Sequence, residues 1–264
     1  MLAGAVTVLL FCQRPPTLFV KPPHARVNFR GRVVVGTLGV VLLVPLALGA
    51  AAALTSGAAV RMVVAVTASG TLLGIVGLAD DVYGDRRAGG LIGHARALVR
   101  GRVTTGTAKA FSGVVVGLAA AWVIGWRSWS VVIAGAVIAL SAHMANLLDV
   151  RPARTLKVWL ACFVGLAVGA GLTDGVLTVA SLAGGAAGFL EPDLRERGML
   201  GDTGSGILGG SLGAAAAASL NRTALLGCLA GLAVLTVASE FVSFTQVIER
   251  VAPLRFLDSL GRPP

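Results

Sequence analysis

Hydrophobic residues in this chain come in long blocks that are separated by short clusters of polar or charged residues. Most blocks approach the roughly 20 residues that an α-helix needs to cross the hydrocarbon core of a membrane. The pattern therefore predicts about nine membrane-spanning helices, near Leu2 to Cys12, Val33 to Leu54, Val60 to Ala79, Thr107 to Gly125, Trp129 to Leu148, Thr155 to Leu172, Gly175 to Leu190, Gly204 to Leu220 and Thr223 to Phe244.

Composition narrows the fold class further. The chain has 264 residues, of which 56% are hydrophobic and 13% charged, whereas a soluble domain carries roughly 25% charged residues. Its 36 glycines follow no Gly-X-Y period, which excludes collagen, and helices rich in small residues can approach one another closely. We expect an all-α, polytopic membrane helical bundle, with one integral membrane domain over residues 1–264 and a short cytoplasmic C-terminal tail over residues 244–264.

The distribution of charge predicts an orientation. The formal net charge is +10, and most Lys and Arg residues lie beside predicted spans. If the N-terminus is outside, only Arg61, Arg127 and Arg222 of the 22 basic residues fall on the outer side. Because this asymmetry follows the positive-inside rule, we expect a multi-pass protein of the cell membrane with a cytoplasmic working face and no nucleic-acid partner.

Three segments on the predicted inner face place carboxylates at the ends of spans. They are Asp80-Asp81, Asn146-Leu-Leu-Asp149 and Gly201-Asp202-Thr203-Gly204-Ser205-Gly206. A carboxylate at a membrane edge is costly to bury without a partner, and Mg²⁺ takes oxygen ligands, usually one or two carboxylates together with water and phosphate. Three such segments facing one compartment suggest a shared Mg²⁺.

Two of these segments leave alternatives open. Adjacent residues on a helix point about 100° apart, so one of Asp80 and Asp81 could bind metal while the other activates a nucleophile, or both could offset nearby arginines. The glycine-rich segment could bind a phosphate at a helix N-terminus, with a hydroxyl contact from Thr203 or Ser205. In the structural alternative, Asp202 is only the cap of that helix.

Other polar residues have plainer interpretations. Asn146 and Asp149 are three residues apart and share a helix face, on which His143 lies one turn earlier. We interpret His143 as a packing residue. The basic segment from Asp85 to Lys109 could lie on anionic lipid or bind a nucleotide diphosphate, and the sequence leaves both uses open.

Taken together and in this order, the three segments resemble the polyprenyl-phosphate hexose-1-phosphate transferase superfamily, which includes the phospho-N-acetylmuramoyl-pentapeptide transferase of peptidoglycan synthesis. The resemblance runs from about Arg30 to Arg255. It implies a Mg²⁺-dependent reaction in which a polyprenyl phosphate attacks the sugar-linked phosphate of a UDP-sugar at the cytoplasmic membrane face, and UMP leaves. The product would serve the synthesis of cell-wall or surface glycans.

The resemblance also implies roles for individual residues. Asp80 and Asp81 match the catalytic aspartate pair, and Asp202 matches the principal Mg²⁺ ligand. Asn146 and Asp149 match the polar pair of the nucleotide-sugar cleft, and Gly201 lies where the family's backbone meets the uridine. Thr203 belongs to the same candidate substrate-binding set.

The chain departs from the family pattern in three places. Arginines follow Asp149, in the stretch Asp149-Val-Arg-Pro-Ala-Arg154, and an early Pro-x-x-Gly-Gly segment is reduced to Asn28-Phe-Arg-Gly-Arg32. The loop after the ninth predicted span should carry a histidine-rich motif, but it reads Ala252-Pro-Leu-Arg-Phe-Leu-Asp258. Arg255 is a candidate substitute for the missing positive contact.

These departures keep a second function open, that of a catalytically inactive relative that binds a lipid phosphate or a partner protein as a membrane scaffold. A transporter ranks last, because the carboxylates gather at one face rather than near the midplane. The sequence identifies neither the sugar nor the lipid length, and it leaves a homodimer open.

Overall fold

The computed structural model describes residues 1–13, 24–28, 30–84, 99–101 and 104–262. Much of the basic segment from Asp85 to Lys109 therefore lies outside the described residues. The described chain is almost entirely helical, as predicted. Its elements are α1 (Leu2–Gln13), β1 (Ala25–Val27), β2 (Val33–Val35), the 3-10 helix η2 (Leu38–Leu42), α2 (Leu43–Thr55), α3 (Val60–Tyr83), α5 (Thr105–Ile124), α6 (Ser130–Leu148), α7 (Arg154–Ala170), α8 (Asp174–Leu194), α9 (Gly201–Ser219), α10 (Arg222–Phe241), α11 (Phe244–Arg250) and α12 (Ala252–Ser259).

Six helical segments of the described chain are long and apolar enough to cross a membrane, so the predicted nine spans are not confirmed. The six are Leu38–Thr55, α3, α5, α6, α8 and α10. Three further predicted spans form helices that are too short or too polar to be counted among these six. α1 has 12 residues and α7 has 17, while the 19 residues of α9 include glycines, serines and an aspartate that dilute its apolar character.

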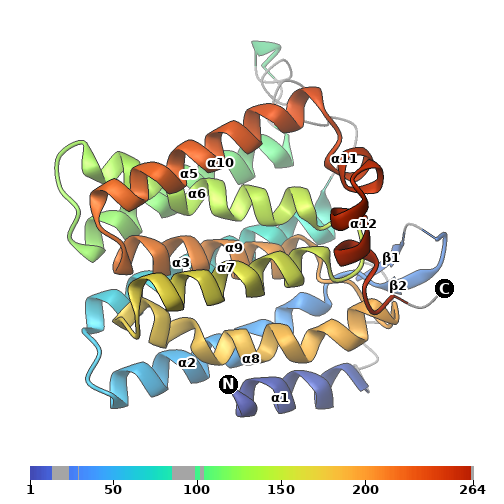
Figure 1. Cartoon of the computed structure of the whole chain (residues 1–264), viewed down its shortest axis with the longest axis horizontal. Coiled ribbons are helices and arrows are strands. Elements are labelled where there is room, and N and C mark those ends of the chain that lie inside the picture. Colours follow the sequence, from blue (N-terminus) through green and yellow to red (C-terminus); the bar gives the residue numbers. More distant parts are fainter. Residues whose placement is uncertain (14–23, 29, 85–98, 102–103, 263–264) are drawn as a thin grey trace.

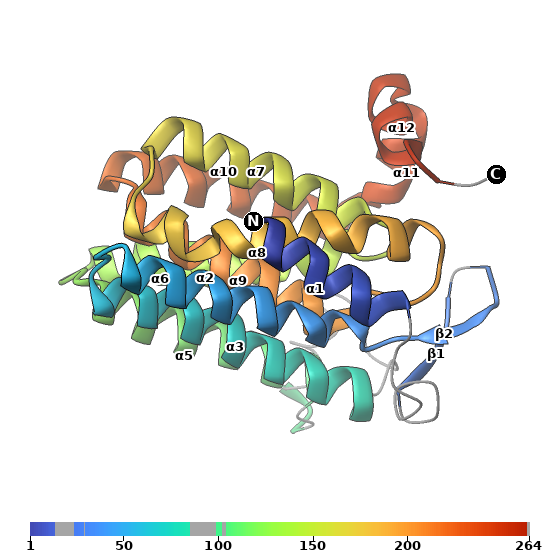
Figure 2. The same cartoon turned by 90° about the horizontal axis from the view of Figure 1, so that it is seen from below.

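The long helices run side by side, and α9 lies in the middle of the bundle (Figures 1 and 2). α9 packs mainly against α3 and α6. The contact with α3 is close because glycines face the neighbouring backbone. A Cβ atom on Gly77 would overlap the carbonyl oxygen of Asp202, and one on Gly206 would overlap the carbonyl oxygen of Leu73. A buried central helix packed in this way does not need the apolar composition of a lipid-facing span.

The predicted span from Val33 to Leu54 is wrong at its start. Val33–Val35 is a strand that pairs antiparallel with Ala25–Val27, and the helical part begins only at Leu38. Strand β2 is also hydrogen-bonded to the loop before α9, because the Met199 N–H donates to the carbonyl oxygen of Val35 at 2.7 Å. Three successive valines fit a strand because β-branched side chains pack well on a pleated surface.

One end of the bundle collects the β-hairpin, the C-terminal helices α11 and α12, and the ends of α3, α6 and α8 (Figure 1). We call this the polar end. At the opposite end the long helices are joined by short turns (Figure 1). The predicted tail from residue 244 onward forms α11 and α12 at the polar end, and α12 ends at Ser259.

Candidate functional site

The polar end brings four helices together around the ammonium group of Lys109. Its Nζ atom lies 2.8 Å from an Asp202 carboxylate oxygen and 3.1 Å from an Asp80 carboxylate oxygen. It also donates a weaker hydrogen bond of 3.4 Å to the Asn146 side-chain oxygen. Three of the four residues come from the three segments that the sequence singled out, and they meet around Lys109, whereas the shared Mg²⁺ stays a prediction. We call these four residues the Lys109 cluster.

Local helix boundaries set these positions. Asp80 lies in the last turn of α3, and Asn146 lies in the last turn of α6. α5 begins after Thr104, whose hydroxyl accepts a hydrogen bond from the Thr107 N–H as an N-cap, so Lys109 lies just past the first turn. Asp202 lies in the first turn of α9. All four side chains therefore lie at the helix ends that meet at the polar end.

Lys109 is the member of this site that the sequence analysis did not select. The sequence analysis places it only at the end of the basic segment that begins at Asp85. The signal that could have identified it is its position inside the predicted span from Thr107 to Gly125, because a cation within an apolar helix almost always pairs with a buried carboxylate. Its side chain is 22% exposed, compared with 17% for Asp80 and 28% for Asp202.

Asp81 points to a different partner from Asp80. Its carboxylate accepts hydrogen bonds from the N–H groups of Asp202 and Thr203, at 3.0 and 2.9 Å, and from the Thr203 hydroxyl at 2.6 Å. The anion at the N-terminus of α9 is therefore the carboxylate of Asp81, at a position for which a phosphate was one of the two open alternatives. This carboxylate satisfies orphan N–H groups and the positive end of the helix dipole.

Asp202 is also not the N-cap of α9, which was the structural alternative for this residue. The N-cap position of α9 is occupied by Leu200, and Asp202 lies inside the first turn with its side chain directed to Lys109. Thr203 is almost fully buried against Asp81. Ser205 donates to the Asp202 carbonyl oxygen at 3.1 Å and lies 3.4 Å from the Asn146 side-chain oxygen.

Gly201 begins α9 in a conformation that favours glycine. Its φ angle is +68°, and a Cβ atom there would overlap the carbonyl oxygen of Gly36 and lie 2.9 Å from an Asp81 carboxylate oxygen. Any other residue would displace the start of the helix that carries Asp202. The structure thus gives Gly201 a defined role in placing the Lys109 cluster.

Asp149 follows α6 and accepts a hydrogen bond from the Gly201 N–H. Burial raises its pKa well above the usual value, and the negative charges of Asp193 and Asp202 act in the same direction. Asp149 also borders a small cavity of about 40 Å³ with Asn28, Asp193 and Glu196. Asp149 therefore contacts the start of α9 at Gly201, next to Asp202 of the Lys109 cluster.

The β-hairpin supports the loop that leads into this site. The Asn28 side chain donates to a Glu196 carboxylate oxygen at 2.7 Å, and the Arg30 guanidinium lies 3.0 Å from the other oxygen of that carboxylate. The departure at Asn28 to Arg32 is therefore a structural contact between the hairpin and the segment before α9.

Arg255, a site candidate, and His143, a predicted packing residue, form no hydrogen bond with the Lys109 cluster within the described part of the chain. Arg255 is an exposed residue of α12 and also forms no ion pair with the cluster in that part of the chain. The Nε2 atom of His143 is buried without a hydrogen-bond partner among the described residues. That is an unusual state for a packing histidine.

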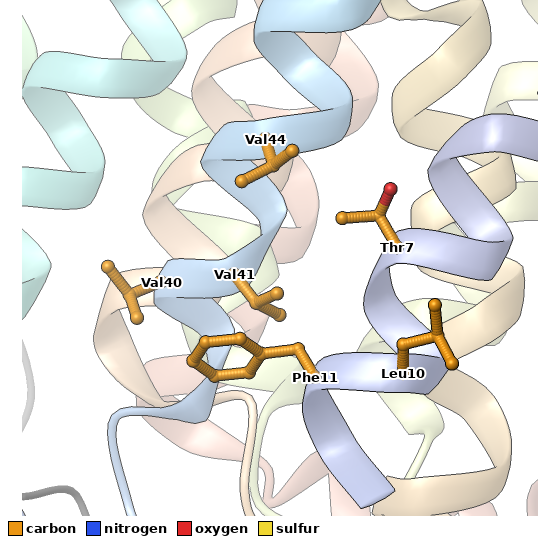
Figure 3. A pocket seen from close by; sticks show the side chains of 6 residues that line it. All are labelled: Thr7, Leu10, Phe11, Val40, Val41 and Val44. Carbon is orange, nitrogen blue, oxygen red and sulfur yellow. The ribbon is translucent and has the colours of Figure 1, made fainter. Parts of the chain in front are cut away.

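An apolar groove lies apart from the site. It has a volume of about 630 Å³ and lies between α1 and the η2–α2 segment (Figure 3). Phe11 and Leu10 line one side, and Val40 and Val44 line the other (Figure 3). It contains no titratable side chain, so it contributes nothing to the chemistry of the cluster.

The donor set can be compared with the needs of Mg²⁺. Asp80 and Asp202 each direct a carboxylate oxygen at one positive charge, and Asn146 directs an amide oxygen at the same charge. Among the described residues, no group of three or more His, Cys, Asp or Glu side chains is arranged to hold a metal ion. Two carboxylates with water and phosphate would be an ordinary Mg²⁺ ligand set, but Lys109 occupies both carboxylates, so the Mg²⁺ site stays a prediction.

No protein-family model matches this sequence, and a search of curated proteins finds no match. The functional argument therefore depends on the geometry and on the sequence motifs.

Proposed function

We propose that the protein is a membrane transferase that moves a sugar-1-phosphate from a UDP-sugar to a polyprenyl phosphate, with Mg²⁺, at the cytoplasmic face. The observation that carries this proposal is the convergence of Asp80, Asp202 and Asn146 on the single cation of Lys109. Phosphoryl transfer requires little covalent chemistry from a protein, and chiefly needs positioned charges around phosphate oxygens. A cation held between two carboxylates at a helix end can supply them.

Placement in a membrane supports the lipid acceptor. Six helical segments are long and apolar enough to span a bilayer, and the Lys109 cluster lies at the ends of three of them. A polyprenyl phosphate presents its headgroup at the membrane surface, which is the level that the polar end would occupy. The positive-inside count then assigns this end to the cytoplasm, where UDP-sugars are found.

In this proposal Asp80 and Asp202 would hold the Mg²⁺, which supplies charge neutralisation of the diphosphate. Lys109 moves from the carboxylates to a phosphate oxygen of the substrates and stabilises negative charge during transfer. An oxygen of the polyprenyl phosphate attacks the sugar-linked phosphorus, and the bond from that phosphorus to the UMP oxygen breaks. Asn146 orients one of the bound groups by hydrogen bonding.

Asp81 acts in this proposal as a positioning residue. Both of its carboxylate oxygens accept hydrogen bonds from backbone N–H groups at the start of α9, so Asp81 holds Asp202 in place. Asp149 and Gly201 support the same helix start from the other side. The substrate-binding roles that the resemblance implies for Asp149, Gly201, Thr203 and Arg255 remain predictions.

A second candidate function is a catalytically inactive scaffold that binds a lipid phosphate or a partner protein. The observation that favours it is that Lys109 already forms ion pairs with both Asp80 and Asp202. The histidine-free segment at α12 also contacts the start of α7 through Asp258. A site in which the lysine already has carboxylate partners could be retained in a protein that has no catalytic turnover.

The experiment that separates the two functions measures UMP release. Purified protein in detergent is supplied with Mg²⁺, a polyprenyl phosphate and a panel of UDP-sugars, beside an Asp202→Asn variant and an Asp174→Asn variant. Asp174 is a matched control because it also lies in the first turn of a helix, α8, but at the opposite end. The transferase predicts UMP release that requires lipid and Asp202 but not Asp174. A folded, lipid-binding protein that releases no UMP from any donor would favour the scaffold.

A further inference from the structure

The C-terminal helix α12 has two chemically different sides. At about 100° per residue, Pro253, Leu254, Phe256 and Leu257 fall within one arc of about 160°, and Arg255, Asp258 and Ser259 occupy the other side. Phe256 is 65% exposed, Leu257 56% and Leu254 42%. A helix this short with an apolar side exposed to water is unstable alone, so the apolar side needs a partner.

A set of ionic contacts fixes the rotation of α12. The Arg154 guanidinium donates two hydrogen bonds to the Asp258 carboxylate, at 2.8 and 3.0 Å, and Arg262 lies 3.0 Å from the same carboxylate. Lys157 donates to the carbonyl oxygens of Leu257, Asp258 and Leu260 at the C-terminal end of α12. Arg154 is 3% exposed and Asp258 10%. The polar side of α12 is thereby held against the start of α7.

Because Asp258 faces the bundle, the apolar side must face away from it. Figure 2 shows α11 and α12 projecting from the polar end on the side of the bundle where α7 and α10 lie. The chain reaches them directly from α10, a candidate membrane span in which only Leu225 and Thr236 are buried. Exposed apolar residues continue along this path, from Val237 and Phe241 of α10 to Val247 and Val251 and then to α12. The apolar side is therefore continuous with the surface that would face lipid.

The charges beside this apolar path suit a lipid surface. Arg250 ends α11 and Arg255 lies on the polar side of α12. Among the described residues, no carboxylate forms an ion pair with either of them. Basic residues that flank an apolar helix face are typical of helices that lie in a membrane interface and contact anionic headgroups.

We propose that α12 is a membrane-surface helix whose apolar side, formed by Leu254, Phe256 and Leu257, lies among the lipids at the polar end, with its orientation fixed by the contact of Asp258 with Arg154. This inference rests on the membrane placement in the proposed function but not on the transferase activity. It assigns a role to Arg154, one of the arginines after Asp149, and to the histidine-free tail, because Arg154 and Asp258 form one contact.

The test places spin labels on single cysteines in a protein whose three native cysteines are replaced by alanine. The protein is reconstituted in vesicles of phosphatidylcholine and phosphatidylglycerol, and collision with oxygen, which is enriched in lipid, is compared with collision with a water-soluble nickel chelate. Labels at Phe256→Cys and Leu257→Cys probe the apolar side. A label at Ser259→Cys is the matched control, because Ser259 is also exposed but lies on the polar side.

The proposal predicts that labels at positions 256 and 257 collide several-fold more with oxygen than with the nickel chelate, and that position 259 shows the reverse. In an Asp258→Asn variant this contrast should shrink, because α12 loses its fixed rotation. Free access of the chelate to all three positions would overturn the proposal and leave a protein partner as the occupant. This result does not depend on turnover, so failure of the transferase assay and failure of this test are separate outcomes.

Discussion

The two ends of the bundle use charged residues differently. At the opposite end, Arg222 lies 3.5 Å from the centre of the Trp129 ring and Arg127 lies 5.1 Å from that of Trp122. Asp174 accepts a hydrogen bond from the Ala59 N–H at 3.0 Å in the turn that joins α2 to α3. Each of these three charges holds a turn or covers an aromatic ring.

At the polar end the charges converge on one another. Lys109, Asp80 and Asp202 come from three different helices and meet within 3.1 Å. Gathering two carboxylates is unfavourable unless a cation accompanies them, and here the half-buried Lys109 is that cation. The comparison teaches that charge count alone does not identify a site. What distinguishes the polar end is that side chains from separate helices share one charge.

The largest expected effect comes from removing the shared cation. We expect Lys109→Met to lower UMP release by about 10²–10³-fold, because a positioned charge at the transferring phosphate is lost. Arg222→Met, which removes a cation at the opposite end, should leave turnover within about twofold, since exposed surface changes are usually small. Equal losses in both variants would show that the two ends do not differ in function.

The second effect concerns how α9 is held. Gly77→Ala should destabilise the protein by about 1–3 kcal/mol or more, because the new methyl group meets the Asp202 backbone. Gly227→Ala in α10 is the matched control, since no atom lies within 4 Å of the position of its new Cβ. There the higher helix propensity of alanine should leave stability unchanged or raise it by up to about 1 kcal/mol. Thermal unfolding in detergent measures both, and a similar melting temperature for the two variants would contradict the close α3–α9 contact.

A third variant distinguishes the two neighbouring aspartates. Asp81→Asn should destabilise the fold by about 1–3 kcal/mol, because an amide group cannot accept hydrogen bonds through both of its heavy atoms. Asp80→Asn keeps an acceptor for Lys109 and should lower activity with a smaller loss of stability. Melting temperatures and UMP release are measured for both variants. A stable Asp81→Asn protein without activity would instead place Asp81 in direct contact with substrate.

The smallest effect is a pH dependence at α12. Burial opposes ionisation of Asp258, but its hydrogen bonds with Arg154 and Arg262 and their charges outweigh this and lower its pKa. The contact therefore stabilises docking above the unfolded pKa of about 3.9 and is lost as the pH falls through the lower folded value. A spin label at Ser259→Cys should stay immobile down to the ordinary carboxyl pKa of about 3.9 and become mobile only at a pH below that value. Immobility throughout, with the helix content unchanged, would show that the ion pair does not hold α12.

Much of the bundle could be predicted from the order of apolar blocks, because each helix must bury or expose an apolar surface of about its own length. The number of membrane spans could not be predicted in this way. The apolar block of α7 is only 17 residues long as a helix, and α9 is surrounded by protein. Hydropathy does not distinguish a buried glycine-rich helix from a lipid-facing one. The strand at Val33–Val35 was missed because three valines suit both structures.

The site was partly predictable for a similar reason. Spacing and topology indicate that Asp80, Asn146 and Asp202 lie at one end, and the structure brings them together. Sequence could not assign Asp81 to the start of α9, because that contact joins residues 121 and 122 positions apart. It also could not show that Arg154 pairs with Asp258, 104 positions away. Long-range pairs of charged residues have no local signature.

The measurement that tests the central claim most directly is the binding of Mn²⁺, as a spectroscopic substitute for Mg²⁺, in the presence of UDP. Free Mn²⁺ gives a strong electron paramagnetic resonance signal that falls on binding, so no correct sugar or lipid is needed. We predict that UDP increases Mn²⁺ binding by the wild-type protein, that Asp202→Asn abolishes this increase and that Asp174→Asn preserves it. Nucleotide-dependent binding that is the same in wild type and Asp202→Asn, or that is absent in folded wild-type protein, would contradict the assignment of the Lys109 cluster as a phosphoryl-transfer site.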